Sequence, residues 1–180
     1  MSTEHGRVLE GQGWFVLNAR EAQWWARKGR GFLCEFEGAG FEEAADFLQL
    51  GINVTVLGPG EPMAMYHWEA DQEDFLVLSG KALAIVEGEE RPLRQWDFLH
   101  CPPGTNHVII GAGEGPCLVL AVGARDRSTG PDWGAYTVDE AAQRHGAGVE
   151  RETTHGEEAY AAAGFSGGEL TRYREGWLPE

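Results

Sequence analysis

Short apolar runs separated by glycine and proline fill the middle of the chain and limit the folds open to it. Between residues 51 and 124, runs of about four to six apolar and β-branched residues recur at close, regular intervals. They are VTVL, FLVL, ALAIV, a run leading into Pro102-Pro103-Gly104, VII and CLVLAV. Runs of this length that end at Gly- or Pro-containing turns are typical of strands. We therefore predict an antiparallel sandwich or barrel rather than alternating strands and helices.

The segment before these runs has a different pattern. Asn18 followed by Glu21 is a capping pattern that predicts a helix over residues 19–26. An outlying strand is expected over residues 32–36. Residues 41–48 have helical spacing and predict a short helix.

The segment after the runs is also expected to be partly helical. Thr137 precedes Val138-Asp139-Glu140, a capping box for a helix that reaches about Gln143. A second, weaker helical pattern covers residues 157–163. The expected organisation is one barrel domain with two extensions: an N-terminal extension over 1–49, the barrel over 50–124 and a C-terminal extension over 125–180.

Charge and composition exclude several classes of function. The 180 residues include 14 basic and 29 acidic side chains, for a net charge of −15. This argues against nucleic acid and anionic membrane surfaces as partners, since both require clusters of Lys and Arg. No apolar run approaches the ~18 residues of a membrane span, and the polar start shows no secretory signal. Cys34, Cys101 and Cys117 are widely spaced and odd in number, which predicts free thiols in the cytoplasm.

The residues that carry chemistry lie in two places, around His67 and around His107. Because alternate side chains of a strand share a face, His67 and Glu69 should point the same way. Glu73 follows at even spacing and reaches that face if the strand bends. The turn Pro102-Pro103-Gly104 fixes where His107 enters its strand. Two imidazoles and one or two carboxylates inside a barrel suit a divalent transition metal.

These residues resemble the two motifs of the cupin superfamily. The first motif runs Gly, five residues, His-x-His, three or four residues, Glu, six residues, Gly; His67, Glu73 and Gly80 fall on it. The second runs Gly, five residues, Pro-x-Gly, two residues, His, three residues, Asn; residues 102–104 and His107 match it. The resemblance covers roughly the barrel segment. It implies an all-β fold, a small jelly-roll barrel with a metal in its mouth, often in a homodimer.

The chain departs from the cupin pattern at four positions. Glu69 replaces the second His of the first motif, so the usual set of three His and one Glu is not available. Gly60 lies six residues before His67 instead of five. Trp96 stands where the second motif has Gly, and Gly111 replaces its final Asn.

The resemblance places His67, Glu73 and His107 at metal-ligand positions, with Fe(II), Mn, Ni or Zn as the metal. Glu69 occupies the position of a motif histidine but is a different residue type. It is either a further ligand or an acid or base beside the metal. His100, on the strand before the diproline turn, is a second candidate catalytic residue. It either lines the cavity as a proton-transfer group or is buried against a backbone partner.

Three functions remain open. The first is a metal-dependent cupin that acts on a small organic molecule, dioxygenase-like because two His and one carboxylate leave positions open for substrate and dioxygen. The second is a non-catalytic cupin that binds a small molecule. The third is an isomerase or epimerase, but the basic residues of 51–124 are only Lys81, Arg91 and Arg94, near predicted turns, which argues against phosphorylated substrates. A homodimer is expected because small barrels leave sheet faces and edges to cover.

Overall fold

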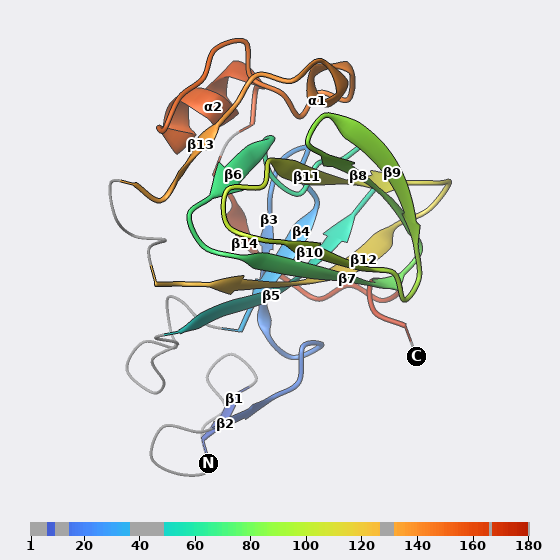
Figure 1. Ribbon diagram of the computed structural model, residues 1–180. Helices are drawn as coiled ribbons and strands as arrows, with labels where there is room; N and C mark the ends of the chain where they lie inside the picture. Colours follow the sequence, from blue (N-terminus) through green and yellow to red (C-terminus); the bar gives the residue numbers. More distant parts are fainter. Residues whose placement is uncertain (1–6, 10–14, 37–48, 127–131, 166, 180) are drawn as a thin grey trace.

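Two antiparallel sheets form the body of the protein, so the fold is mostly β (Figure 1). The computed structural model describes residues 7–9, 15–36, 49–126, 132–165 and 167–179. The helix predicted over residues 41–48 lies outside the described residues. Among the described residues, none of the helices has the length and apolar character that a membrane span requires.

The larger sheet has seven strands in the order β10-β7-β12-β5-β4-β3-β14, and the smaller has five in the order β13-β6-β11-β8-β9. The seven are β10 (Phe98–Cys101), β7 (Glu73–Ser79), β12 (Cys117–Ala124), β5 (Leu50–Leu57), β4 (Phe32–Glu35), β3 (Gln23–Ala26) and β14 (Glu169–Arg172). The five are β13 (Gly134–Tyr136), β6 (His67–Glu69), β11 (His107–Ala112), β8 (Lys81–Val86) and β9 (Glu89–Arg94). A separate hairpin joins β1 (Arg7–Leu9) to β2 (Phe15–Leu17).

The two sheets face each other across one apolar core. Its buried members come from both sheets, including Phe75 and Val77 of β7, Val119 of β12 and Ile109 of β11. Side chains alternate along a strand, so Phe75 and Val77 fix the inward face of β7. Glu73, two residues before Phe75, lies on the same inward face. The core thereby sets the direction in which this carboxylate points.

The N-terminal segment forms a strand where the sequence predicts a helix over residues 19–26. The carbonyl of Asn18 accepts a hydrogen bond from the N–H of Ala22 at 3.0 Å, which closes a single turn, and the chain then extends as β3. β3 pairs with β4 and β14, and Trp24 is fully buried with its ring 5.1 Å from that of Trp177. Sheet pairing and the burial of Trp24 override the local capping signal, so the prediction is wrong.

Two short helices follow the barrel, close to the predicted C-terminal positions. They are α1 (Glu140–Arg144) and α2 (Gly156–Ala162). The cap of α1 is Asp139 and not Thr137, since Asp139 Oδ1 accepts a hydrogen bond from the N–H of Ala142 at 2.8 Å. Ala142 packs with Ile85 and Val108 in one buried cluster, so α1 covers the outer face of the five-stranded sheet (Figure 1).

Candidate metal centre

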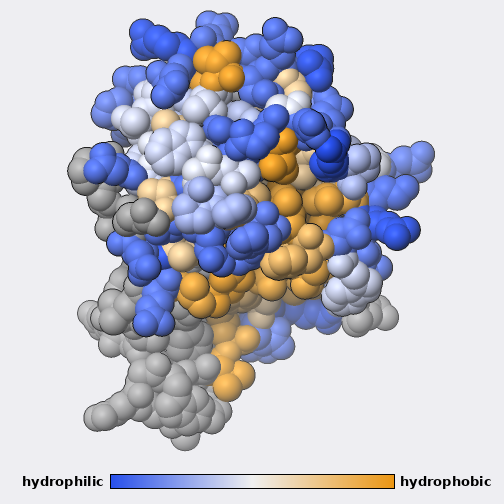
Figure 2. All heavy atoms as spheres, viewed as in Figure 1, coloured by the Kyte–Doolittle hydropathy of each residue, from blue (hydrophilic) through white to orange (hydrophobic). Residues whose placement is uncertain are grey.

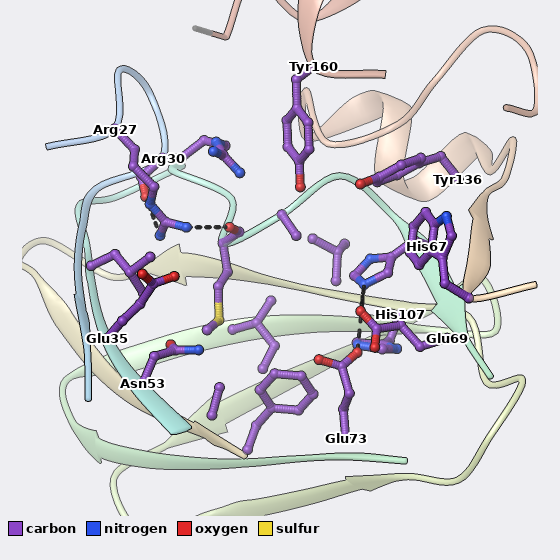
Figure 3. A pocket seen from close by; sticks show the side chains of 18 residues that line it. Arg27, Arg30, Glu35, Asn53, His67, Glu69, Glu73, His107, Tyr136 and Tyr160 are labelled. Atoms are coloured by element: carbon purple, nitrogen blue, oxygen red, sulfur yellow. Dashed lines mark hydrogen bonds and ion pairs between the residues drawn. The ribbon is translucent and has the colours of Figure 1, made fainter. Parts of the chain in front are cut away.

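Three strands bring two histidines and a glutamate to one point. His67 is the first residue of β6, Glu73 the first of β7 and His107 the first of β11. One ligand atom from each lies within 4.8 Å of the other two. His67 and His107 are paired directly across β6 and β11, with ring centroids 5.0 Å apart. Figure 3 shows the three side chains converging in a pocket.

Backbone carbonyls hold both imidazoles in place. Nδ1 of His67 lies 2.7 Å from the carbonyl oxygen of Met65, and Nδ1 of His107 lies 3.0 Å from that of Thr105. A carbonyl oxygen only accepts, so Nδ1 carries the hydrogen in each ring. In the neutral ring Nε2 then presents its lone pair to the centre. Metal-binding histidines in proteins are oriented by the same kind of hydrogen bond.

The arrangement at the centre fits a metal ion. Nε2 of His107 and Oε2 of Glu73 are 3.1 Å apart, and both atoms are buried without a hydrogen-bond partner among the described residues. Two acceptors at this distance repel each other unless a proton or a cation lies between them. Buried polar atoms normally have partners. Imidazole nitrogens with a carboxylate are a donor set that suits divalent transition metals.

Without a metal, protons are drawn to the same place. Burial lowers the pKa of His67, but the carboxylates of Glu69 and Glu73 outweigh it and raise that pKa to about 10. Burial also lowers the pKa of His107, whereas Cys101 and Glu73 beside it raise the value to about 9. Burial raises the pKa of Glu73, yet the two imidazoles hold it well below its usual range. The centre strongly favours positive charge.

Glu69 lies beside this trio without belonging to it. It is on β6 two residues after His67 and shares its face, with Oε1 3.5 Å from Nε2 of His67. Its oxygens are not among the ligand atoms that lie within 4.8 Å of one another. The side chain is 22% exposed, so it reaches both the centre and solvent. This position suits a group that exchanges protons.

The structure contradicts both expectations for His100, which neither lines the cavity nor is buried against a backbone partner. On β10 the neighbours Leu99 and Cys101 pack into the core, so His100 faces outward. Its Nδ1 lies 2.6 Å from Oδ1 of Asp74, the residue opposite it on β7, and its side chain is 50% exposed. Because Leu99 and Cys101 face the core, His100 between them must face outward.

The trio opens into a cavity of about 360 Å³. Part of the cavity wall comes from outside residues 50–124: Arg27, Arg30, Trp133, Tyr136 and Tyr160. None of these residues was predicted to belong to the site. No motif marks them. The pairing of β3, β4 and β13 brings Arg27, Arg30, Trp133 and Tyr136 to the cavity, and α2 brings Tyr160, whose ring contacts that of Tyr136.

The sequence of the barrel segment matches a known family. The family model for the cupin domain matches residues 53–123. Residues 53–123 therefore form a cupin domain. No curated protein matches the sequence of this chain.

Solved structures with a similar barrel include three proteins of named function or family. A putative sugar phosphate isomerase from Acidithiobacillus ferrooxidans is 25% identical, with a TM-score of 0.45 over 53% of this chain and 60% of that chain. A Cupin 2 conserved barrel domain protein from Salinispora arenicola is 18% identical, with a TM-score of 0.45 over 52% and 75% of the two chains. The DMSP lyase DddQ from Ruegeria pomeroyi is 23% identical, with a TM-score of 0.44 over 54% and 48%.

Of the departures from the family motifs, the structure explains the one at Gly111 and does not explain the one at Trp96. A Cβ atom on Gly111 would lie 2.1 Å from the carbonyl oxygen of Gly58, so the position has no room for the Asn of the motif. Trp96 stands where the motif has Gly, and its backbone has φ 72°, the left-handed region that favours Gly. Its side chain is 68% exposed, so the strained backbone is not offset by burial.

Proposed function

We propose that this protein is a metal-dependent jelly-roll cupin that acts on a small organic molecule, with dioxygenase-like chemistry. The observation that carries the proposal is the convergence of His67, Glu73 and His107, whose ligand atoms lie within 4.8 Å of one another, with His107 Nε2 and Glu73 Oε2 buried 3.1 Å apart. His67, Glu73 and His107 would hold Fe(II), Mn, Ni or Zn. When bound, the metal supplies Lewis-acid polarisation and open positions for a chelating substrate.

The charges of the chain's own residues select the substrate end that approaches the centre. Two neutral imidazoles and one carboxylate leave a single positive charge on a divalent ion, which attracts chelating anionic oxygens such as those of a catecholate, an enediol or a 2-hydroxy acid. Glu69, 3.5 Å from His67 and partly exposed, is placed to take the proton from such a hydroxyl group. Burial, with Tyr160 beside it, raises the pKa of Tyr136 well above its usual value, so this hydroxyl stays protonated in the cavity wall.

An oxygen-electrode screen tests the proposal. The Fe(II)-loaded protein is mixed with catechol-like and enolisable compounds, and dioxygen uptake is compared among the wild type, Glu73→Ala and His100→Ala. The wild type and His100→Ala should consume dioxygen, because His100 lies outside the cavity, whereas Glu73→Ala should not. Uptake no greater than that of Glu73→Ala across the whole screen would favour the non-catalytic binding protein.

The isomerase or epimerase alternative gains support from the cavity wall. Residues 51–124 contain few basic side chains, but Arg27 and Arg30 line the cavity from the N-terminal segment. In that case Glu69 would transfer the proton directly. Turnover by chelator-treated protein without dioxygen would identify this alternative, since the first proposal needs both the metal and dioxygen.

We also propose a homodimer located in the cytoplasm. Figure 2 shows apolar side chains gathered over β7 and β10 of the seven-stranded sheet. Phe98 of β10 is 63% exposed and lies opposite Leu76 of β7, which in turn lies opposite Leu120 of β12. The exposed Phe98 at the end of this apolar row supports burial against a second copy. The three cysteines are buried and unpaired, which fits a reducing compartment.

A further inference from the structure

The cavity has a second polar end, formed by Arg27 and Arg30. Both belong to the turn between β3 and β4, where the N–H of Arg27 donates to the carbonyl of Gly31 at 2.9 Å and the N–H of Arg30 donates to the carbonyl of Arg27 at 2.9 Å. Figure 3 shows both arginines on the side of the pocket opposite the metal trio. The two ends share one cavity of about 360 Å³.

Contacts within the chain fix both guanidinium groups. Arg27 donates from Nη1 to the carbonyl of Met63 at 3.4 Å and from Nη2 to the carbonyl of Arg30 at 3.0 Å. The guanidinium carbon of Arg30 lies 4.1 Å from the ring centroid of Tyr160, a cation–π contact with α2. No carboxylate of the described residues forms an ion pair with either group. Both guanidinium groups are therefore held in place without a carboxylate at ion-pair distance in the described part of the chain.

Both arginines also have one buried side-chain nitrogen. Nε of Arg27 and Nε of Arg30 are buried and have no hydrogen-bond partner among the described residues. Burial, with the charge of Arg30 adding to it, lowers the pKa of Arg27 to about 10, so the group is still charged at neutral pH. Both arginines line the cavity, and an anionic oxygen is the ligand that a charged guanidinium group there binds best.

We propose that Arg27 and Arg30 bind a carboxylate group of the substrate, while the opposite end of the same molecule chelates the metal. The substrate class is thus a small compound with chelating oxygens at one end, a carboxylate at the other and an apolar part between them. Met63, Phe75 and Ile109 line the cavity and supply apolar contacts for that part. Glu35 is on the same wall and offsets one of the two arginine charges, which favours a single carboxylate over a doubly charged phosphate. The chelating end rests on the function proposed above, and the carboxylate site does not.

Calorimetry with matched compounds tests this inference. Zn²⁺-loaded protein is titrated with 4-methylcatechol and with three acids of increasing length: 3,4-dihydroxybenzoate, 3,4-dihydroxyphenylacetate and 3-(3,4-dihydroxyphenyl)propionate. At least one acid should bind about tenfold or more tightly than 4-methylcatechol, because one charge-assisted hydrogen bond contributes a difference in affinity of about this size. Arg30→Gln and Arg27→Gln should abolish this preference and leave the affinity for 4-methylcatechol unchanged.

Lys28→Gln is the matched control. Lys28 is exposed in the same turn and its loss removes the same charge, so the carboxylate preference should survive. Arg30→Lys, with circular dichroism confirming the fold, keeps the charge without the planar guanidinium and should bind the acid with intermediate affinity. A wild-type preference that survives both Gln variants, or that Lys28→Gln removes equally, would overturn the carboxylate site.

A metal-free titration separates this inference from the proposed function. Chelator-treated protein is titrated with benzoate and with benzyl alcohol. A preference for benzoate that depends on Arg30 supports the carboxylate site even where Zn²⁺ fails to bind, in which case the proposed function falls alone. Stoichiometric Zn²⁺ binding without any preference for the acids would contradict the carboxylate site and leave the metal centre standing.

Discussion

His67 and His107 lie directly opposite each other on β6 and β11, and each ring has its Nδ1 beside the carbonyl oxygen two residues earlier in the chain. The same local geometry is therefore repeated at the first residue of two adjacent strands. Both Nε2 atoms reach one point, where Glu73 meets them from the opposite sheet. A ligand pair is thus organised by strand pairing and backbone hydrogen bonds before any metal binds.

The pKa shifts at this centre predict how stability depends on pH when no metal is bound. The pKa values of His67 and His107 are raised from 6.5 to about 10 and about 9, so their protonation stabilises the fold fully below 6.5. That stability is lost as the pH rises through 9 to 10. The lowered pKa of Glu73 adds stability above 4.5, which is lost as the pH falls through its folded value. Urea denaturation of chelator-treated protein should show the free energy of unfolding falling between about pH 7 and pH 10.

His67→Gln is the control for this measurement, since it removes one of the two titrating rings and should flatten the pH dependence. Metal affinity should change in the opposite direction and rise over the same pH interval, because a metal must displace the protons. A free energy of unfolding that stays constant between about pH 7 and pH 10 in the metal-free wild type would show that the imidazoles are not protonated there.

Restoring the family residue at Gly111 should destabilise the protein. A side chain there meets the carbonyl oxygen of Gly58, with Cβ at 2.1 Å, so Gly111→Asn should lower the free energy of unfolding by about 2 kcal/mol or more. Gly115→Asn is the matched control, because a Cβ atom at Gly115 meets nothing within 4 Å. Equal stability of the two variants in urea denaturation would contradict the predicted clash.

At position 96, in contrast, we expect the family residue Gly to suit the backbone better than a residue with a side chain. Its φ of 72° disfavours any side chain, and its 68% exposure means that little burial is lost on truncation. Trp96→Gly should therefore be more stable than Trp96→Ala by about 1 kcal/mol, since only Gly adopts this conformation freely. Thermal denaturation of the two variants side by side provides the measurement. Greater stability of the Ala variant would exclude strain at this position.

Much of the barrel could be predicted from the sequence because its strands are apolar runs that follow one another closely along the chain. The six apolar runs correspond to β5, β7, β8, β10, β11 and β12. The spacing of His67, Glu73 and His107 also indicated a shared site, because the motif fixes which strand end each residue occupies. β9 was not predicted, since the edge strand EERPLR is charged and exposed and has no apolar run.

The remaining features depend on partners distant in the chain. β3 is a strand because β14, far along the sequence, pairs with it, and no local signal at Asn18 contains that information. The outward direction of His100 follows from the packing of Leu99 and Cys101 in the core. Arg27 and Arg30 reach the cavity only because β4 adds to the edge of β5.

The homodimer predicts a specific effect at Phe98. Phe98→Asp places a charge in the apolar row on the open sheet face and should convert a dimer into a monomer in sedimentation velocity runs at micromolar concentration. Val138→Asp is the control, because Val138 is 52% exposed and follows β13 on the other sheet. A wild-type monomer under these conditions, or a dimer unaffected by Phe98→Asp, would exclude this face as the interface.

Metal analysis of protein purified without an affinity tag tests the metal centre most directly. The wild type and His100→Ala should each retain about one divalent metal ion per chain, because His100 faces away from the centre. His67→Ala, Glu73→Ala and His107→Ala should each lose most of it, since a site held by three protein ligands loses much of its affinity when one is removed. Glu69→Gln should retain the metal. Full metal content in all three trio variants would contradict the assignment of His67, Glu73 and His107 as the metal site.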